Sequence, residues 1–213
     1  MTTRRELERE FRKELIARAA HRLFSSSSYE AITVEDIARG AEFGKGTIYQ
    51  YFASKEEILA YVVCRGINRL CRDIEEQCLG QPDIRSALNT LMALQYRFHR
   101  EHGHLFLSLL RRKLDGSLDP ELFNVIRQKL KKKTELTATL LEQGIRAGIF
   151  VPVDSYKLAR ILENVIKGFI LEDMEKRFPE ADAEQDLEFI RLVLSEGIML
   201  HGGRKTNGEA KEQ

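Results

Sequence analysis

Long apolar runs are missing from this chain of 213 residues. No stretch approaches the roughly 20 apolar residues that a helix needs to cross a bilayer, so the sequence predicts no membrane partner. The period-two alternation of half-buried strands is also missing, and there are only 4 prolines. With 43% hydrophobic residues, these absences predict an all-α protein. The charged start, MTTRRELEREFRKE, is unlike a signal peptide and predicts a cytoplasmic location.

The sequence also has no marked excess of one charge and no recognisable catalytic motif. The formal net charge is +1, and the first 60 residues hold ten basic and ten acidic side chains, so composition does not by itself indicate nucleic acid. The sequence has no glycine-rich phosphate loop after a strand, no Cys-x-x-Cys and no His-Glu-x-x-His. We therefore expect neither an enzyme nor a bound cofactor.

Cysteine is limited to Cys64, Cys71 and Cys78, which are spaced seven residues apart. On a helix, neighbours with this spacing lie about 10.5 Å apart, too far for a disulfide within the helix. An odd number of cysteines without an export signal is typical of a reducing compartment. We expect small apolar core residues here, with a redox switch or an inter-subunit bridge as the alternative.

Residues 33–55, TVEDIARGAEFGKGTIYQYFASK, carry the most informative pattern. Thr33 and Asp36 have the spacing of a capping box, which begins a short helix. Gly44 interrupts the apolar pattern and can adopt the left-handed conformation of a sharp turn. A second helix is expected over residues 45–52. This layout predicts a helix-turn-helix DNA reader.

The outward face of the second helix suits DNA. Its hydroxyl and ammonium groups can donate to phosphate oxygens, and Gly46 lets the backbone approach closely. Gln50 can hydrogen-bond a base edge in the major groove. Lys55 lies in the first turn of the next helix, where the helix dipole disfavours a cation, and this position indicates a nearby phosphate.

Residues 15–59, LIARAAHRLFSSSSYEAITVEDIARGAEFGKGTIYQYFASKEEIL, resemble the DNA-binding domain of the tetracycline-repressor (TetR) family of bacterial transcriptional regulators. The most specific matches are GTIY at 46–49, YF at 51–52 and SKEE at 54–57. The resemblance implies positions at or near DNA for Thr33, Lys45, Gly46, Thr47, Tyr49, Gln50, Tyr51 and Lys55. Two departures concern a serine run at 25–28, which replaces the usual turn, and Glu35 and Glu42, which are acidic beside the reading surface.

The rest of the chain is expected to be helical. Helices are predicted over residues 54–79, 83–101, 105–114, 119–147, 154–176 and 183–201. Gly103 is expected to break one of them, and Asp119-Pro120 is a start signal because an N-cap residue precedes proline. The predicted organisation is a three-helix helix-turn-helix domain (1–58), a helical effector-binding and dimerisation domain (59–203) and a disordered polar tail (204–213).

The last two predicted helices are apolar on more than one side, which indicates burial against a partner. Pairing both with their symmetry mates would form a four-helix bundle about a two-fold axis, an arrangement that the resemblance also implies. The expected homodimer interface comprises Leu158, Ile161, Leu162, Val165, Phe169, Ile190, Leu194 and Ile198.

Polar and aromatic residues within the helices are candidates for an effector pocket or for plain core. Asn164 and Lys167 interrupt an apolar stretch and could line a pocket or edge the interface. The histidines of HREHGH (99–104) are divided by Gly103, which disfavours a metal site. The basic runs at 111–113 and 129–133 are expected to be solvated helix faces. The candidate effector-binding residues are Tyr96, His99, Phe106, Phe123, Gln143, Asn164 and Lys167.

These features predict a ligand-responsive transcriptional regulator, most simply a repressor. It would bind a palindromic double-stranded DNA operator as a homodimer and be released by a small, largely apolar effector. Three alternatives remain open at this stage: a repressor without a ligand, a redox- or metal-responsive regulator, and a helical carrier or enzyme whose helix-turn-helix is only scaffold.

Overall fold

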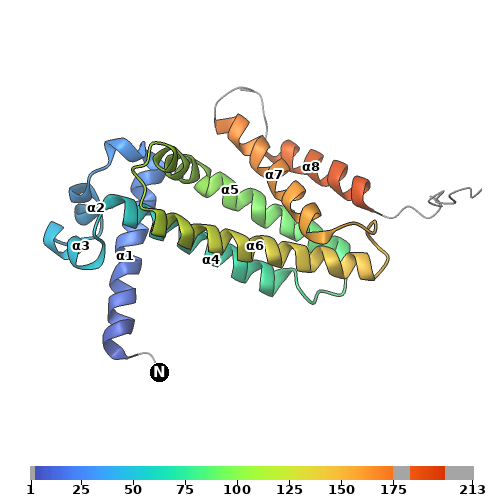
Figure 1. Cartoon of the computed structure of the whole chain (residues 1–213), viewed down its shortest axis with the longest axis horizontal. Helices are drawn as coiled ribbons and strands as arrows, with labels where there is room; N and C mark the ends of the chain where they lie inside the picture. Colours follow the sequence, from blue (N-terminus) through green and yellow to red (C-terminus); the bar gives the residue numbers. More distant parts are fainter. Residues whose placement is uncertain (1–2, 175–182, 200–213) are drawn as a thin grey trace, which may run out of the picture.

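The computed structural model describes residues 3–174 and 183–199, and this part of the chain folds into eight α-helices and one 3-10 turn (Figure 1). A compact group at one end comprises α1 (Arg4–Ser26), η1 (Tyr29–Ala31), α2 (Val34–Gly40) and α3 (Lys45–Tyr51). The larger part comprises α4 (Lys55–Gln77), α5 (Ile84–Leu114), α6 (Pro120–Arg146), α7 (Ser155–Met174) and α8 (Ala183–Ile198). The predicted all-α fold is confirmed. Among the described helices, none is long and apolar enough to span a membrane.

Local capping signals define the small N-terminal group. The Asp36 backbone N–H donates to the Thr33 hydroxyl at 3.1 Å, and the Thr33 N–H donates to the Asp36 carboxylate at 3.0 Å. The predicted capping box is therefore present and begins α2. Ile48 and Phe52 point inward and are at most 1% exposed, so α3 is anchored by two residues and its other faces stay free.

The turn between α2 and α3 differs from the prediction. Gly44 has φ −72°, and the left-handed residue is Glu42, at φ 60°. The Phe43 N–H donates to the Ala38 carbonyl and the Glu42 N–H to the Arg39 carbonyl, which is the hydrogen-bond pattern of a Schellman cap. Two backbone hydrogen bonds and the packing of Phe43 against the core offset the strain of a non-glycine residue at this position.

Helix α4 connects the two parts without a break, so the predicted boundary at residue 58 falls within one continuous helix. Cys64, Cys71 and Cys78 are free, buried thiols on this helix. Burial raises the pKa of the Cys64 thiol to about 11, which keeps it protonated and unreactive at neutral pH. These positions agree with the expectation of core residues.

Helix α5 runs unbroken through Gly103, where the sequence predicted an end. A glycine inside a helix costs only about 1 kcal/mol relative to alanine, and the burial of Phe98 and Leu105 on either side outweighs that cost. Helix α6 begins as predicted, with Asp119 as the N-cap and Pro120 in the first turn. Both helices are long enough to reach from the reader, the N-terminal group of α1, α2 and α3, to the far end of the molecule (Figure 1).

Helix α7 packs against α5 and α6, and α8 packs against α5 and α7, and this packing corrects the predicted dimer interface (Figure 1). Four of its eight residues are buried in the monomer core, at most 9% exposed, and cannot form an outer face: Leu158, Leu162, Ile190 and Ile198. Ile161 is 55% exposed, and Val165 and Leu194 are partly buried. The side chain of Phe169 and the predicted tail lie outside the described residues.

Candidate DNA-reading surface and effector cavity

The outer face of α3 is free along its length. Lys45, Gly46, Tyr49 and Gln50 are exposed, Tyr49 to 50%. Adding a Cβ at Gly46 would meet no heavy atom within 4 Å, so open space lies over the helix N-terminus. A phosphate could therefore approach the free backbone N–H groups of the first turn.

Thr47 and Tyr51 are partly buried beside this exposed face. The guanidinium of Arg9 lies over the Tyr51 ring at 5.6 Å, so α1 supports this side chain from behind. Thr33 is exposed, but its hydroxyl is engaged in the capping box. These residues combine a structural role with a position at the edge of the reading face.

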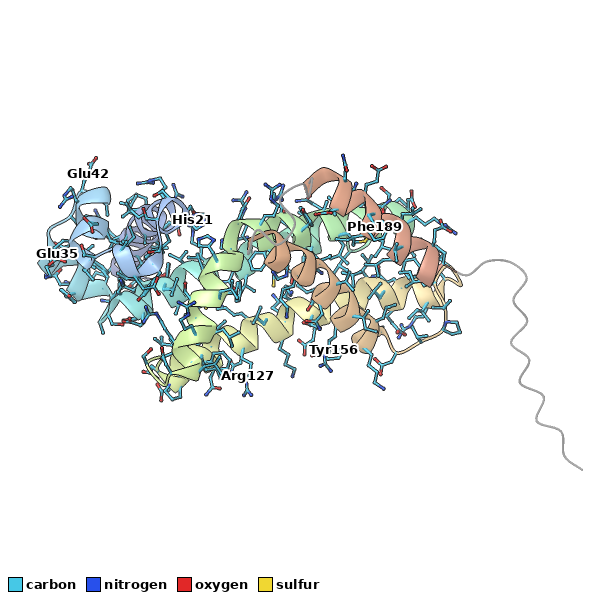
Figure 2. All side chains as sticks on the ribbon, turned by 90° about the horizontal axis from the view of Figure 1, so that it is seen from above. His21, Glu35, Glu42, Arg127, Tyr156 and Phe189 are labelled. Atoms are coloured by element: carbon cyan, nitrogen blue, oxygen red, sulfur yellow. The ribbon has the colours of Figure 1, made fainter. Side chains whose placement is uncertain are left out.

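Lys45 and Glu35 form an ion pair at the outer end of the reader. Both side chains are about half exposed, and this pairing raises the pKa of Lys45 and lowers that of Glu35. Figure 2 shows Glu35 and Glu42 at the extremity farthest from Tyr156 and Phe189. The Lys45 ammonium is a usable phosphate contact, but a phosphate must compete with the Glu35 carboxylate for it.

Lys55 has a structural role that the sequence did not predict. Its ammonium donates to the backbone carbonyls of Tyr29 at 2.8 Å and of Ile32 at 2.7 Å. It also lies over the Tyr29 ring, 4.1 Å from the centroid. Partial burial and the nearby Arg112 lower the pKa of Lys55. The ammonium ties the start of α4 to η1, and this accounts for a cation in the first turn without a phosphate.

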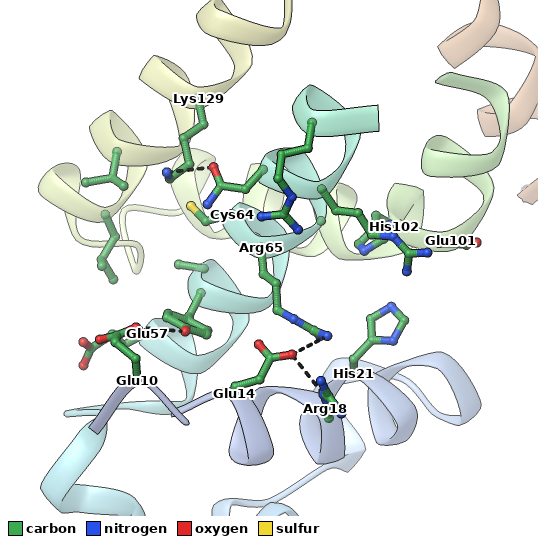
Figure 3. A pocket seen from close by; sticks show the side chains of 18 residues that line it. Glu10, Glu14, Arg18, His21, Glu57, Cys64, Arg65, Glu101, His102 and Lys129 are labelled. Carbon is green, nitrogen blue, oxygen red and sulfur yellow. Dashed lines mark hydrogen bonds and ion pairs between the residues drawn. The ribbon is translucent and has the colours of Figure 1, made fainter. Parts of the chain in front are cut away.

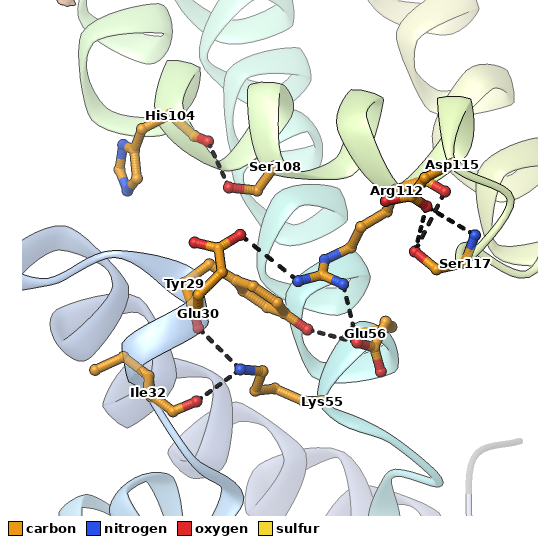
Figure 4. Close-up of polar contacts among 10 residues, drawn as sticks. All are labelled: Tyr29, Glu30, Ile32, Lys55, Glu56, His104, Ser108, Arg112, Asp115 and Ser117. Carbon is orange, nitrogen blue, oxygen red and sulfur yellow. Dashed lines mark hydrogen bonds and ion pairs between the residues drawn. The ribbon is translucent and has the colours of Figure 1, made fainter.

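Arg112 connects the end of α5 to the reader and corrects the expectation of a solvated basic run (Figure 4). Its side chain is only 18% exposed, and the guanidinium lies over the Tyr29 ring at 4.0 Å. It also forms ion pairs with Glu30 at 3.7 Å and Glu56 at 3.5 Å. The Tyr29 hydroxyl donates to the Glu56 carboxylate at 2.9 Å. The elements η1, α4 and α5 therefore meet in one polar cluster.

An apolar cavity of about 380 Å³ lies between α5, α6 and α7. Leu107, Leu109, Leu110, Ile126 and Leu130 form much of its wall. Five of the seven predicted effector residues lie together on it: His99, Phe106, Phe123, Asn164 and Lys167. Tyr96 and Gln143 do not line it: Tyr96 precedes His99, the first lining residue of α5, and Gln143 lies ten residues beyond Lys133, the last lining residue of α6.

Lys133 and Glu163 contribute a buried ion pair to the wall of this cavity, with 3.3 Å between Nζ and Oε2. The Glu163 carboxylate also accepts hydrogen bonds from the hydroxyls of Thr134 at 2.9 Å and Thr137 at 3.3 Å. Lys133 is 3% exposed, so the basic run at 129–133 is not a uniformly solvated face. Burial lowers the pKa of Lys133, and the Glu163 carboxylate opposes that shift.

A larger, charged cleft of about 790 Å³ lies between α1 and helices α4, α5 and α6 (Figure 3). None of the predicted effector residues lines it. Part of its charge is paired within the protein, since Glu14 pairs with Arg65 at 2.6 Å and with Arg18 at 2.9 Å, and Lys129 donates to the neutral amide oxygen of Asn68. The smaller cavity is the better site for an apolar molecule.

Sequence patterns did not reveal Lys133, Glu163 or Arg112 as candidate functional residues. A signal for Lys133 was present, because residues 126, 130, 133 and 137 follow the helical period on the buried face of α6. The run of lysines around it obscured this pattern. Nothing local marked Arg112, whose partners lie more than 50 residues away in the sequence.

An exposed reading helix behind a capped turn defines a helix-turn-helix regulator, and similar proteins identify its family. The profile of "Bacterial regulatory proteins, tetR family" matches residues 16–62. The transcriptional repressor KstR2 of Mycobacterium tuberculosis is 30% identical over 149 residues, which are 66% of this chain and 70% of the repressor. The chain therefore belongs to the TetR family of transcriptional regulators.

Two further similarities extend over most of the chain. The uncharacterised HTH-type transcriptional regulator YhgD of Bacillus subtilis is 24% identical over 188 residues, which are 88% of this chain and 96% of YhgD. FadR from Bacillus subtilis, solved in complex with stearoyl-CoA, has a TM-score of 0.68 at 20% identity and covers 88% of this chain and 99% of its own. The fold is therefore shared beyond the DNA-binding part.

Proposed function

We propose that this protein is a ligand-responsive repressor that binds a palindromic operator as a homodimer. A small, largely apolar effector in the 380 Å³ cavity would release it. The observation that carries the proposal is an exposed reading helix and an apolar cavity in the same chain, joined by helix α5. A regulator of transcription acts where the DNA is, so we place it in the cytoplasm.

The dimer face that we propose consists of large apolar side chains on the outer side of α7 and α8. Five of them are at least 39% exposed: Tyr156, Ile161, Phe189, Leu192 and Val193. Figure 2 places Tyr156 and Phe189 on these two helices, away from the reader. Exposed large apolar side chains on two neighbouring helices are typical of an interaction site, and a two-fold pairing of both helices would bury them.

Arg112 is the contact through which we expect the effector to act on the reader. Leu109 and Leu110 line the cavity, and Arg112 follows within one helical turn on the same helix. A ligand that displaces this end of α5 would move the guanidinium away from Tyr29 and Glu56. It could shift the reader only by its differential affinity for the two arrangements.

A structural neighbour supports an effector with an apolar part. FadR from Bacillus subtilis binds stearoyl-CoA, whose acyl chain is a long apolar group. KstR2 is a repressor, which supports repression as the outcome. The buried thiols of α4, with a raised pKa at Cys64, give no support to a redox-responsive alternative.

Selection of bound sequences from random double-stranded DNA tests the regulator proposal. We expect enrichment of an inverted repeat whose half-sites are centred about one helical turn, or a multiple of it, apart. A compound screen for release of the enriched DNA then identifies effectors. Enrichment of no sequence over the starting pool would contradict the proposal, and a single unrepeated half-site would contradict the homodimer.

Arg112→Gln is expected to weaken the coupling between effector and operator. The effector concentration that releases the enriched DNA should rise at least fivefold, because couplings of this kind amount to about 5- to 150-fold in affinity. Effector binding by calorimetry should stay within twofold of the original. Arg111→Gln, an exposed neighbour on the same helix, is the matched control. Equal release curves for both variants would exclude Arg112 as the coupling residue.

A further inference from the structure

The ammonium of Lys133 is an unusual component of an apolar cavity wall. The side chain is 3% exposed, yet the only acceptor recorded for its three N–H donors among the described residues is the Glu163 carboxylate. The Glu163 carboxylate, in contrast, pairs with the Lys133 ammonium and accepts hydrogen bonds from the hydroxyls of Thr134 and Thr137. The pair therefore has spare donors beside the cavity and few spare acceptors.

Buried donors without acceptors are costly, and charged donors are more costly than neutral ones. A ligand oxygen that approaches Lys133 through the cavity would satisfy such a donor. Most of the remaining wall is apolar, formed by side chains such as Phe106, Phe123 and Leu130, and its other polar residues are His99, Asn164 and Lys167. The site therefore suits a largely apolar ligand that carries one oxygen acceptor.

The charges around Lys133 decide whether the ligand oxygen is neutral or anionic. Lys133 is already neutralised by Glu163, so a ligand carboxylate would share one ammonium with a second carboxylate in apolar surroundings, where like charges repel strongly. His99, also on the wall, adds no positive charge, because burial lowers its pKa to about 3. The Lys167 ammonium is exposed and donates to Asn164 at 2.8 Å, so it could draw an anionic group only toward the cavity's exposed side.

We infer that the effector is an electrically neutral, largely apolar molecule whose carbonyl or hydroxyl oxygen accepts a hydrogen bond from Lys133. Glu163 holds the ammonium in place, and Thr134 and Thr137 hold the carboxylate. This inference rests on the proposed function, since it assigns the chemical class of the ligand for that same cavity. It makes Lys133 a specificity-determining residue.

Three nine-carbon probes test the inference by calorimetry on the full chain at pH 8: 2-nonanone, 1-nonanol and nonanoate. Their chains are short enough for a cavity of about 380 Å³. We expect 2-nonanone and 1-nonanol to bind at least tenfold more tightly than nonanoate. Equal or tighter binding of nonanoate would overturn the neutral class, and this comparison needs no variant.

The paired substitution Lys133→Met with Glu163→Gln removes the ion pair and leaves apolar or neutral groups of similar size, a change that buried pairs often tolerate. We expect it to weaken binding of 2-nonanone at least tenfold. The control is Lys132→Met with Glu75→Gln, an exposed pair at 3.1 Å between α6 and α4, which should leave binding unchanged. Unchanged affinity in the first variant would overturn the role of Lys133.

Binding measurements with the three probes distinguish failure of this inference from failure of the proposed function. Binding of nonanoate alone, with operator release, would preserve an effector site and reject its neutral ligand. Absence of binding by all three probes would reject both the ligand class and the apolar cavity as the effector site. Operator recognition is tested separately by the DNA selection, because that experiment requires no ligand.

Discussion

Replacing Tyr49 and Gln50 together by alanine is expected to lower affinity for the selected operator at least tenfold. Both side chains are exposed on α3 and neither contributes to the core around Ile48 and Phe52. A bidentate contact from glutamine to a base is worth about 1–3 kcal/mol, and a tenfold loss corresponds to about 1.4 kcal/mol. Fluorescence anisotropy with labelled operator measures the loss, and the melting temperature should not change.

Gln128→Ala is the matched control for this variant, because Gln128 is exposed on α6 in the effector domain. Its operator affinity should equal that of the original protein. The double variant should also retain most of its affinity for random DNA if Gln50 reads a base, since phosphate contacts do not depend on sequence. Undiminished operator affinity in the double variant would show that α3 is not the reading helix.

Tyr51 is a poorer choice for this experiment. Its ring is partly buried and packs with Arg9 of α1, so truncation would combine loss of a DNA contact with loss of packing. Thr47, which is also partly buried, raises the same difficulty. Replacing the exposed Tyr49 and Gln50 instead tests DNA affinity without changing the stability of the fold, and a sequence pattern alone could not show which residues allow this.

Local signals predicted much of the fold. The capping box of Thr33 and Asp36 and the start of α6 at Asp119-Pro120 depend on residues within one helical turn, so their sequence is sufficient. The end predicted at Gly103 was wrong because the decisive term is burial against distant helices. A glycine's intrinsic cost is local, but the packing that outweighs it is not.

The candidate sites divide in the same way. Five of the polar and aromatic candidates lie on one cavity, but the sequence could not reveal that Lys133 turns inward to meet Glu163, 30 residues later. It also could not separate Leu158 and Ile190, which the monomer covers, from Ile161, which it leaves exposed. Apolar periodicity shows that a face is buried, and only the tertiary structure shows whether the same chain or a second copy buries it.

Replacing Ile161 and Leu192 together by glutamate is expected to convert the protein to monomers at micromolar concentration. The two side chains are 55% and 61% exposed on α7 and α8, so charges there should leave the monomer fold intact while opposing burial between two subunits. Sedimentation equilibrium measures the mass. Leu114→Glu, at a position 80% exposed at the end of α5, is the control and should leave the oligomeric state unchanged.

The same variant should bind an inverted-repeat operator more than a hundredfold more weakly. In a dimer, the second half-site is bound at the high effective concentration set by the first, and a monomer loses that gain without losing a single contact of α3. Affinity for an isolated half-site should therefore equal that of the original protein's subunit. A dimer that persists in sedimentation, or a monomer that keeps full affinity for the inverted repeat, would exclude this face of α7 and α8 as the link between two readers.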